Sequence, residues 1–304
     1  MVEKRDEIRA MLRRSLGVTS PPEKIVQEPF EQNDAHLRRL VRVGPGERPD
    51  ANDLFRYMED LRYTQIQGSL LVYLLPICLE VWHDDLRGID QRYAGVVEHF
   101  YPVLADRHVF DEQLSAKQTA TVSEFMKKTI LDEIDDQRGL SYSGAGARPY
   151  RWIRALTTYG VLMPDLEHLW TAWWSLDTIG RAVAAIQYGS CLTYSEYENP
   201  VFAPWTGSSG GGPPCLWEFA GHLYAHRWLE PNIIFLRSIL NLRAIEELLS
   251  RATDRLVGQP EHDTAKALLA DLPLCNSVVE ERCKELPRFL ETGQKPNEFF
   301  TWSR

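Results

Sequence analysis

The apolar residues of this chain recur with the period of an α-helix in almost every segment that has a pattern, which most constrains its fold. No run alternates apolar and polar residues as a half-buried strand would. The clearest helical stripe lies within residues 115–136 and comprises Val122, Phe125, Met126, Thr129, Ile130 and Ile134. Period 3.6 without a competing period 2 predicts an all-α protein.

Polar and glycine residues predict where several helices begin and end. Asp50 or Asn52 can cap one helix, and Gly88 can end the buried helix that starts near residue 68. Ser115 with Gln118 three positions later has the spacing of a capping box. In the second half we predict a helix that opens at Pro164 and runs towards residue 188. A second long helix is predicted over residues 231–256.

A flexible segment divides the chain. Residues 139–149, GLSYSGAGARP, are rich in Gly, Ser and Ala and have no period. The 304 residues are enough for two ordinary domains. We therefore predict two packed helical bundles, residues 1–140 and 150–304, joined by this Gly/Ser-rich linker.

The composition indicates a globular, acidic protein. Hydrophobic residues make up 44% and charged residues 25%, which provides for a core and argues against disorder. The net charge is −9, and Arg38, Arg39 and Arg42 form the one tight basic group, which is typical of a solvated helix face. A nucleic-acid interface needs more concentrated positive charge, so we expect no nucleic-acid partner and favour a basic protein.

Cysteine usage and hydropathy indicate the compartment. The five cysteines, an odd number, include no CxxC pair, which favours a reducing environment. The longest apolar run, residues 70–79, is too short to span a bilayer, and residues 1–17 lack the apolar core of a secretory signal. We expect a cytoplasmic protein with no membrane contact.

The first candidate site is a stripe of ionisable side chains. Glu218, His222 and His226 recur every four residues on a predicted helix, so they share one face. Two imidazoles at this spacing can bind a divalent metal such as Zn²⁺, with Glu218 as a third ligand or as the group that orients His222. The glutamate of an HExxH metalloprotease is missing. The alternative is an ordinary polar stripe, beside which the Gly/Pro-rich loop 206–214 is a surface loop or a lid.

A second metal hypothesis concerns Glu80 and His83, an E-x-x-H pair. Di-metal bundles use two such pairs and two further carboxylates. Asp165 with His168, or Glu167, is an incomplete second pair. The alternative is that Glu80 and His83 form the polar end of a buried helix.

Four carboxylates gather at one predicted helix end, namely Asp132, Glu133, Asp135 and Asp136. Negative charge at a helix C-terminus opposes the helix dipole, and a local rule that is broken can mark a binding surface. These residues are therefore our sequence-based candidates for contact with a basic partner, with a solvated helix end as the alternative.

Residues 54–134 resemble an uncharacterised helical domain family found in bacteria. The resemblance lies in YLLPICLEVW (Tyr73 to Trp82) and LSAKQTATVSEFMKK (Leu114 to Lys128). It implies a buried Y-x-L-P helix followed by an L-[ST]-x-x-Q-capped helix, and it implies no activity.

The sequence favours a macromolecule-binding protein over an enzyme. No complete catalytic motif is present, and the acidic charge suits a basic partner, as in an immunity or antitoxin-like protein. The alternative is a metal-dependent enzyme built on Glu218, His222 and His226. A third possibility is a small-molecule binder between the bundles.

Overall fold

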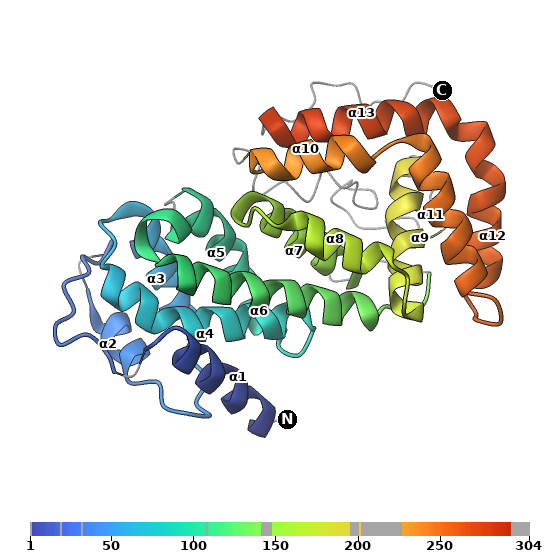
Figure 1. Cartoon of the computed structure of the whole chain (residues 1–304). Coiled ribbons are helices and arrows are strands. Elements are labelled where there is room, and N and C mark those ends of the chain that lie inside the picture. Colours follow the sequence, from blue (N-terminus) through green and yellow to red (C-terminus); the bar gives the residue numbers. More distant parts are fainter. Residues whose placement is uncertain are drawn as a thin grey trace. The chain divides into compact units, whose positions relative to one another are not determined.

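The computed structural model describes residues 2–18, 20–31, 33–106, 109–140, 148–194, 201 and 227–292. Every regular element in these ranges is a helix and none is a strand, which confirms the all-α prediction (Figure 1). No helix in this part of the chain combines the length and the apolar character that crossing a membrane requires.

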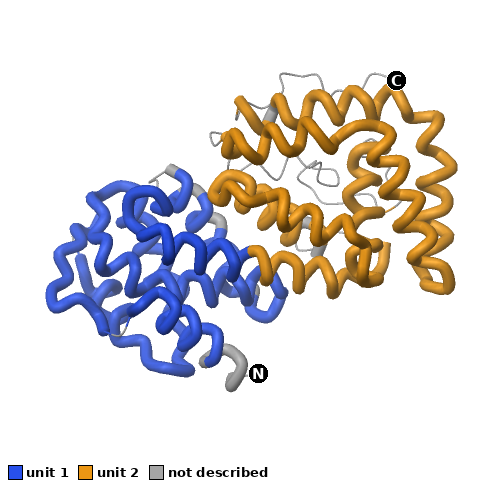
Figure 2. Tube along the Cα trace, viewed as in Figure 1, with its two compact units in different colours: residues 1–126 blue, residues 127–304 orange. Residues whose placement is uncertain are grey.

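The chain forms two compact units, Met1–Met126 and Lys127–Arg304 (Figure 2). The border between them falls inside one helix, whereas the sequence suggested a border at residues 139–149. Residues 141–147 lie outside the described ranges, so the flexible linker stays a prediction.

Unit 1 is built around the helix with the most apolar sequence, α4. Nearly all of α4 is buried, and it packs against α1 and α5, while α3 packs against α2 and α5 (Figure 1). The elements are α1 (Val2–Ser15), α2 (Ala35–Val41), α3 (Ala51–Tyr63), α4 (Gly68–Leu86), η1 (Gln91–Tyr93), α5 (Ala94–Asp106), the π-helical turn η2 (Val109–Gln113) and the start of α6 (Ala116–Asp135).

The predicted helix ends of unit 1 are confirmed. Asp50 caps α3, and Ser115 and Gln118 exchange the two hydrogen bonds of a capping box. Gly88 follows α4 with φ 64°, a left-handed conformation that glycine adopts without steric cost. The amide of Ile89 then donates to the carbonyl of Asp84 and closes the helix end.

Unit 2 continues with α7 (Arg148–Leu162), α8 (Leu166–Trp174), α9 (Ile179–Thr193), α10 (Glu230–Ile239), α11 (Leu242–Arg255), α12 (His262–Asp271), η4 (Leu272–Cys275) and α13 (Asn276–Thr292). The helix α9 packs against α8, α11, α12 and α13, and α10 runs beside α13 (Figure 1). The core of unit 2 is rich in aromatic side chains. Trp170 and Trp173 meet Tyr188 edge to face at ring-centroid distances of 5.4 and 5.3 Å, a favoured geometry for aromatic pairs.

Two helices predicted as continuous are each broken in two. The helix over residues 164–188 stops at Trp174, and Thr178 caps the start of α9. The helix over residues 231–256 stops at Ile239, and the side chain of Asn241 caps α11. Apolar period alone misses such breaks, because apolar residues continue on both sides of each break, whereas a capping side chain satisfies the amides that a new helix start exposes.

Candidate functional site

An open cleft of about 700 Å³ lies on unit 1, at α3. It is lined by Glu31 from the segment before α2, by Arg39 on α2 and by residues within 50–59, at the first part of α3. The lining residues are Glu31, Arg39, Asp50, Asn52, Asp53, Phe55, Arg56 and Glu59.

The two arginines of the cleft neutralise two of its carboxylates. Arg39 forms two hydrogen bonds with Asp53, of 2.8 and 2.6 Å, and the hydrogen bond to Asp53 raises the pKa of the Arg39 guanidinium. Arg56 lies 3.6 Å from Glu31. Both arginines are therefore engaged with carboxylates of the cleft.

The two other carboxylates, Asp50 and Glu59, form no ion pair among the described residues, although the charge of Asp50 also raises the pKa of the Arg39 guanidinium. Asp50 uses Oδ1 to accept the amide hydrogens of Asn52 and Asp53, at 2.9 and 3.1 Å, and so caps α3. Glu59 forms no hydrogen bond or ion pair with any residue in the described ranges. The lining therefore has four carboxylates and two guanidinium groups, so the cleft carries a net negative charge.

An exposed aromatic pair adjoins the cleft. The rings of Phe30 and Tyr63 lie 4.7 Å apart between centroids, yet the two residues are 52% and 55% exposed. Phe30 precedes Glu31 in the chain, and Tyr63 follows Glu59 by one helical turn, which places it on the same face of α3. Negative charge and exposed aromatic surface thus occur side by side.

The irregular segment that carries Phe30 is fixed by buried polar groups. The backbone N–H of Phe30 donates to Oδ1 of Asp60 (2.8 Å), whose Oδ2 lies 2.6 Å from Nε2 of the buried His36. Further along, the N–H of Gln27 donates to the side-chain oxygen of Gln67 (3.0 Å), and the N–H of Gln67 donates to that of Gln27 (2.9 Å). The segment is therefore preorganised beside α3.

Sequence reasoning missed this cleft. It identified Asp50 as a cap and Arg39 as part of a solvated face, which are local roles. The outer face of α3 contained a usable signal, because Asn52, Arg56, Glu59 and Tyr63 follow one another at one-turn spacing without an apolar residue that needs burial. The position of Glu31 and Phe30 beside that face depends on tertiary contacts that the sequence does not reveal.

Glu80 and His83, the E-x-x-H candidates, belong to a buried ion network. Glu80 accepts hydrogen bonds from Arg9 Nε (2.5 Å) and Nη2 (3.2 Å), and Nη1 of Arg48 lies 3.5 Å from its Oε1. His83 Nδ1 lies 3.0 Å from Asp84, which Arg48 also contacts. Both oxygens of Glu80 thus face guanidinium groups, and the network ties α1 and the segment before α3 to α4.

This network shifts the pKa of its acids. Burial raises the pKa of Asp84, but hydrogen bonds from His83 and Arg48 outweigh it and hold that pKa below its usual value. At Asp90, whose Oδ2 lies 3.7 Å from Arg48 Nη2, hydrogen bonds from the Arg92 side chain lower the pKa to about 2. Both carboxyls therefore stay ionised to a lower pH than a free aspartate does.

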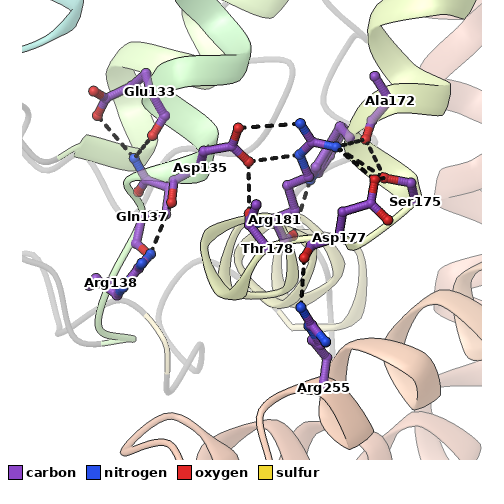
Figure 3. Close-up of polar contacts among 11 residues, drawn as sticks. Glu133, Asp135, Gln137, Arg138, Ala172, Ser175, Asp177, Thr178, Arg181 and Arg255 are labelled. Atoms are coloured by element: carbon purple, nitrogen blue, oxygen red, sulfur yellow. Dashed lines mark hydrogen bonds and ion pairs between the residues drawn. The ribbon is translucent and has the colours of Figure 1, made fainter.

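The four acidic residues at the end of α6 have separate environments. Asp132 pairs with Lys128 one turn earlier (2.5 Å), Glu133 is fully buried, and Asp136 is exposed. Figure 3 shows Asp135 directed at the start of α9, where it accepts hydrogen bonds from Thr178 Oγ1 and Arg181 Nε, both at 2.7 Å. A role in partner binding stays a prediction for these residues, but Glu133 is buried and Asp135 is already engaged by α9.

Glu133 instead starts a line of buried hydrogen bonds through unit 2. The side-chain amide of Gln137 donates to Glu133 Oε1 (3.0 Å), and that of Gln187 donates to Gln137 Oε1 (3.3 Å). The indole N–H of Trp152 then donates to Gln187 Oε1 (3.0 Å). Such partners are what a polar group needs when it is buried.

The histidine stripe of Glu218, His222 and His226, and the loop 206–214, lie outside the described residues. Within the part that the structure describes, no group of three or more His, Cys, Asp or Glu side chains could hold a metal ion. The metal hypothesis for the stripe therefore stays a prediction.

The chain matches no family model, no curated protein and no solved structure. The resemblance of residues 54–134 to a bacterial helical family is thus a prediction that these comparisons neither support nor oppose.

Proposed function

We propose that this protein binds a basic segment of a partner protein, and that the cleft on unit 1 is the contact surface. The observation that carries the proposal is the excess of carboxylates over guanidinium groups in an open cleft, where Asp50 and Glu59 form no ion pair among the described residues, beside the exposed Phe30–Tyr63 pair.

The charge of the whole chain supports the same proposal. A net charge of −9 attracts a cationic partner over about a Debye length and accelerates its encounter with the protein. Charged residues at the rim with aromatic residues beside them are typical of protein interfaces. A nucleic acid would be repelled by the same charge.

An immunity or antitoxin-like protein that neutralises a basic toxin is the concrete form of this proposal. We also propose a cytoplasmic location, which is supported by the free thiols of the four cysteines in the described ranges, Cys78, Cys191, Cys275 and Cys283.

The proposal is tested by capture of basic proteins from a bacterial lysate on the immobilised chain at low and high salt. The test variant is Asp50→Asn with Glu59→Gln, in which asparagine keeps the helix cap. The matched control, Glu246→Gln with Asp254→Asn, removes the same charge from exposed positions on α11 of unit 2.

We expect salt-sensitive capture by the parent and the control, and strongly reduced capture by the cleft variant. Equal capture by all three proteins would show that the cleft is not the contact surface. Absence of any salt-sensitive partner would overturn the proposed function itself.

A further inference from the structure

We infer that the cleft selects arginine over lysine in its partner, an inference that rests on the proposed function and names the side chain recognised. It combines three features of unit 1: the exposed Phe30–Tyr63 pair, the carboxylate of Glu59 one turn away, and the rigid support of the segment that carries Phe30.

One ring of the pair, that of Tyr63, already carries a guanidinium group of the same chain. The side chain of Arg62 lies over the ring of Tyr63, with Cζ 5.4 Å from the ring centroid, which is within cation–π distance. The two aromatic residues nevertheless stay about half exposed, so unoccupied ring surface remains. A planar guanidinium stacks on such a surface, whereas an ammonium group is a compact and strongly hydrated point charge.

The carboxylates of the cleft offer the second half of the contact. The Arg39–Asp53 pair shows the forked geometry in which one guanidinium gives two hydrogen bonds to one carboxylate. Glu59 also ends in a carboxylate, and this carboxylate has no hydrogen-bond or ion-pair partner in the described ranges. Because Glu59 and Tyr63 lie one turn apart on α3, we expect a partner's guanidinium on the ring surface that Arg62 leaves exposed to reach this carboxylate as well. Lysine can satisfy the charge but not both contacts.

The segment that carries Phe30 is ordered before binding, so these contacts form with a small loss of conformational entropy. The segment is held by Asp60, which is 1% exposed and binds the Phe30 amide, and by the reciprocal hydrogen bonds of Gln27 and Gln67. A surface that is ordered before binding loses little conformational entropy when the partner arrives. Asp60 is thus a positioning residue for the aromatic surface.

The test measures binding of three fluorescent peptides to the full-length protein by anisotropy at low salt. The peptides share the sequence Gly-Xaa-Gly-Gly-Xaa-Gly, where Xaa is arginine, lysine or the neutral arginine analogue citrulline. We expect the arginine peptide to bind about tenfold more tightly than the lysine peptide, and the citrulline peptide to bind least.

Variants separate the rings from the charge. Phe30→Leu and Tyr63→Leu should lower the affinity for arginine to that for lysine and leave the affinity for lysine unchanged, whereas Tyr63→Phe should retain the preference. Glu59→Gln should lower the affinity for the arginine peptide and for the lysine peptide. The melting temperature of each variant shows whether it is folded.

The outcomes distinguish the two proposals. Equal binding of arginine and lysine peptides, reduced by Glu59→Gln, would overturn the arginine preference and leave the binding of a basic segment intact. No binding of either cationic peptide by folded protein would overturn both. A preference for arginine that survives Phe30→Leu and Tyr63→Leu would overturn the role of the rings.

Discussion

Single buried charges hold remote segments of unit 1 together. Arg9 on α1 contacts Glu80 on α4 and donates to the carbonyls of Gly44 and Glu47 at 2.9 Å each. Arg9 and Glu80 are 3% and 2% exposed. A buried ion pair adds little net stability compared with apolar residues of the same size, but breaking it by removal of one partner costs much more.

The Arg9–Glu80 pair therefore predicts strong coupling. Arg9→Leu should lower the free energy of unfolding by about 3 kcal/mol, because it leaves Glu80 buried with Arg48 alone. The double variant Arg9→Leu with Glu80→Leu should lose less than the sum of the two single variants. Urea denaturation measures each value, and strict additivity would contradict the coupling.

A surface pair on the same unit serves as the control. Arg38 and Asp34 form an ion pair one turn apart, with side chains that are 63% and 40% exposed. Arg38→Leu should change the free energy of unfolding by less than about 1 kcal/mol.

Asp84 predicts how the stability of unit 1 depends on pH. The pKa of Asp84 is lower in the folded protein than the usual value of about 4 for an unfolded chain. Its contribution to stability is then complete at neutral pH and is lost as the pH falls below about 4 and through the folded pKa. Asp90, with a pKa of about 2, adds to the same loss.

Asp84→Asn should accordingly be less stable than the parent at neutral pH, with a gap that closes in acid. Urea denaturation at a series of pH values from about 7 down to about 2 measures the gap. A gap that is independent of pH would show that the ionised carboxylate is not what stabilises this position.

Among the elements, the end of α6 shows how a tertiary contact resolves a local conflict. Four carboxylates at a helix C-terminus oppose the dipole of that helix. Asp135, however, lies at the N-terminus of α9, where the dipole of α9 and the guanidinium of Arg181 favour a negative charge. For Asp135, the unfavourable position at the C-terminus of α6 is therefore explained by the packing of α6 against α9 in unit 2.

Gly180 permits this contact. A Cβ atom at this position would lie 2.0 Å from the carbonyl oxygen of Asp135, so only glycine lets the two backbones approach. Gly180→Ala should lower the free energy of unfolding by about 3 kcal/mol, because the backbone of α6 or α9 must move.

Gly95 provides the matched control. It also lies in a helix, α5, and a Cβ atom there would meet nothing within 4 Å. Gly95→Ala should raise stability by about 0.5 kcal/mol, since alanine favours helix and restricts the unfolded chain. Urea denaturation measures both variants, and similar effects of the two substitutions would contradict the close approach at Gly180.

The corner between α8 and α9 explains why helix breaks are hard to predict. Leu176 adopts φ 58°, which is unusual for a residue with a side chain, and it is buried. The neighbouring carbonyls are held by arginines, with Arg251 donating to those of Trp174 and Ser175 and Arg255 to that of Asp177. Nothing in the local sequence indicates that leucine takes this conformation, because the contacts that fix it come from α11.

For the whole molecule, the sequence was informative about class and uninformative about the cleft. Period 3.6 predicted an all-α fold, and Asp50, Gly88 and Ser115 predicted helix ends, because these effects act within one or two turns. The cleft joins residues 31, 39 and 50–59 through contacts of Asp60, Gln27 and Gln67, so it could not be predicted from spacing. The sequence pattern indicated the exposed face of α3, but it did not indicate that Glu31 and Arg39 lie beside that face.

The most direct test of the account is hydrogen exchange of the full chain, measured by mass spectrometry with and without the arginine peptide. We predict added protection in peptides that cover residues 26–63, which carry the cleft and the Phe30–Tyr63 pair, and no such protection in the Asp50→Asn, Glu59→Gln variant. Protection by the arginine peptide that falls elsewhere in the chain, or that is unchanged in this variant, would contradict the central claim that this cleft binds a basic partner.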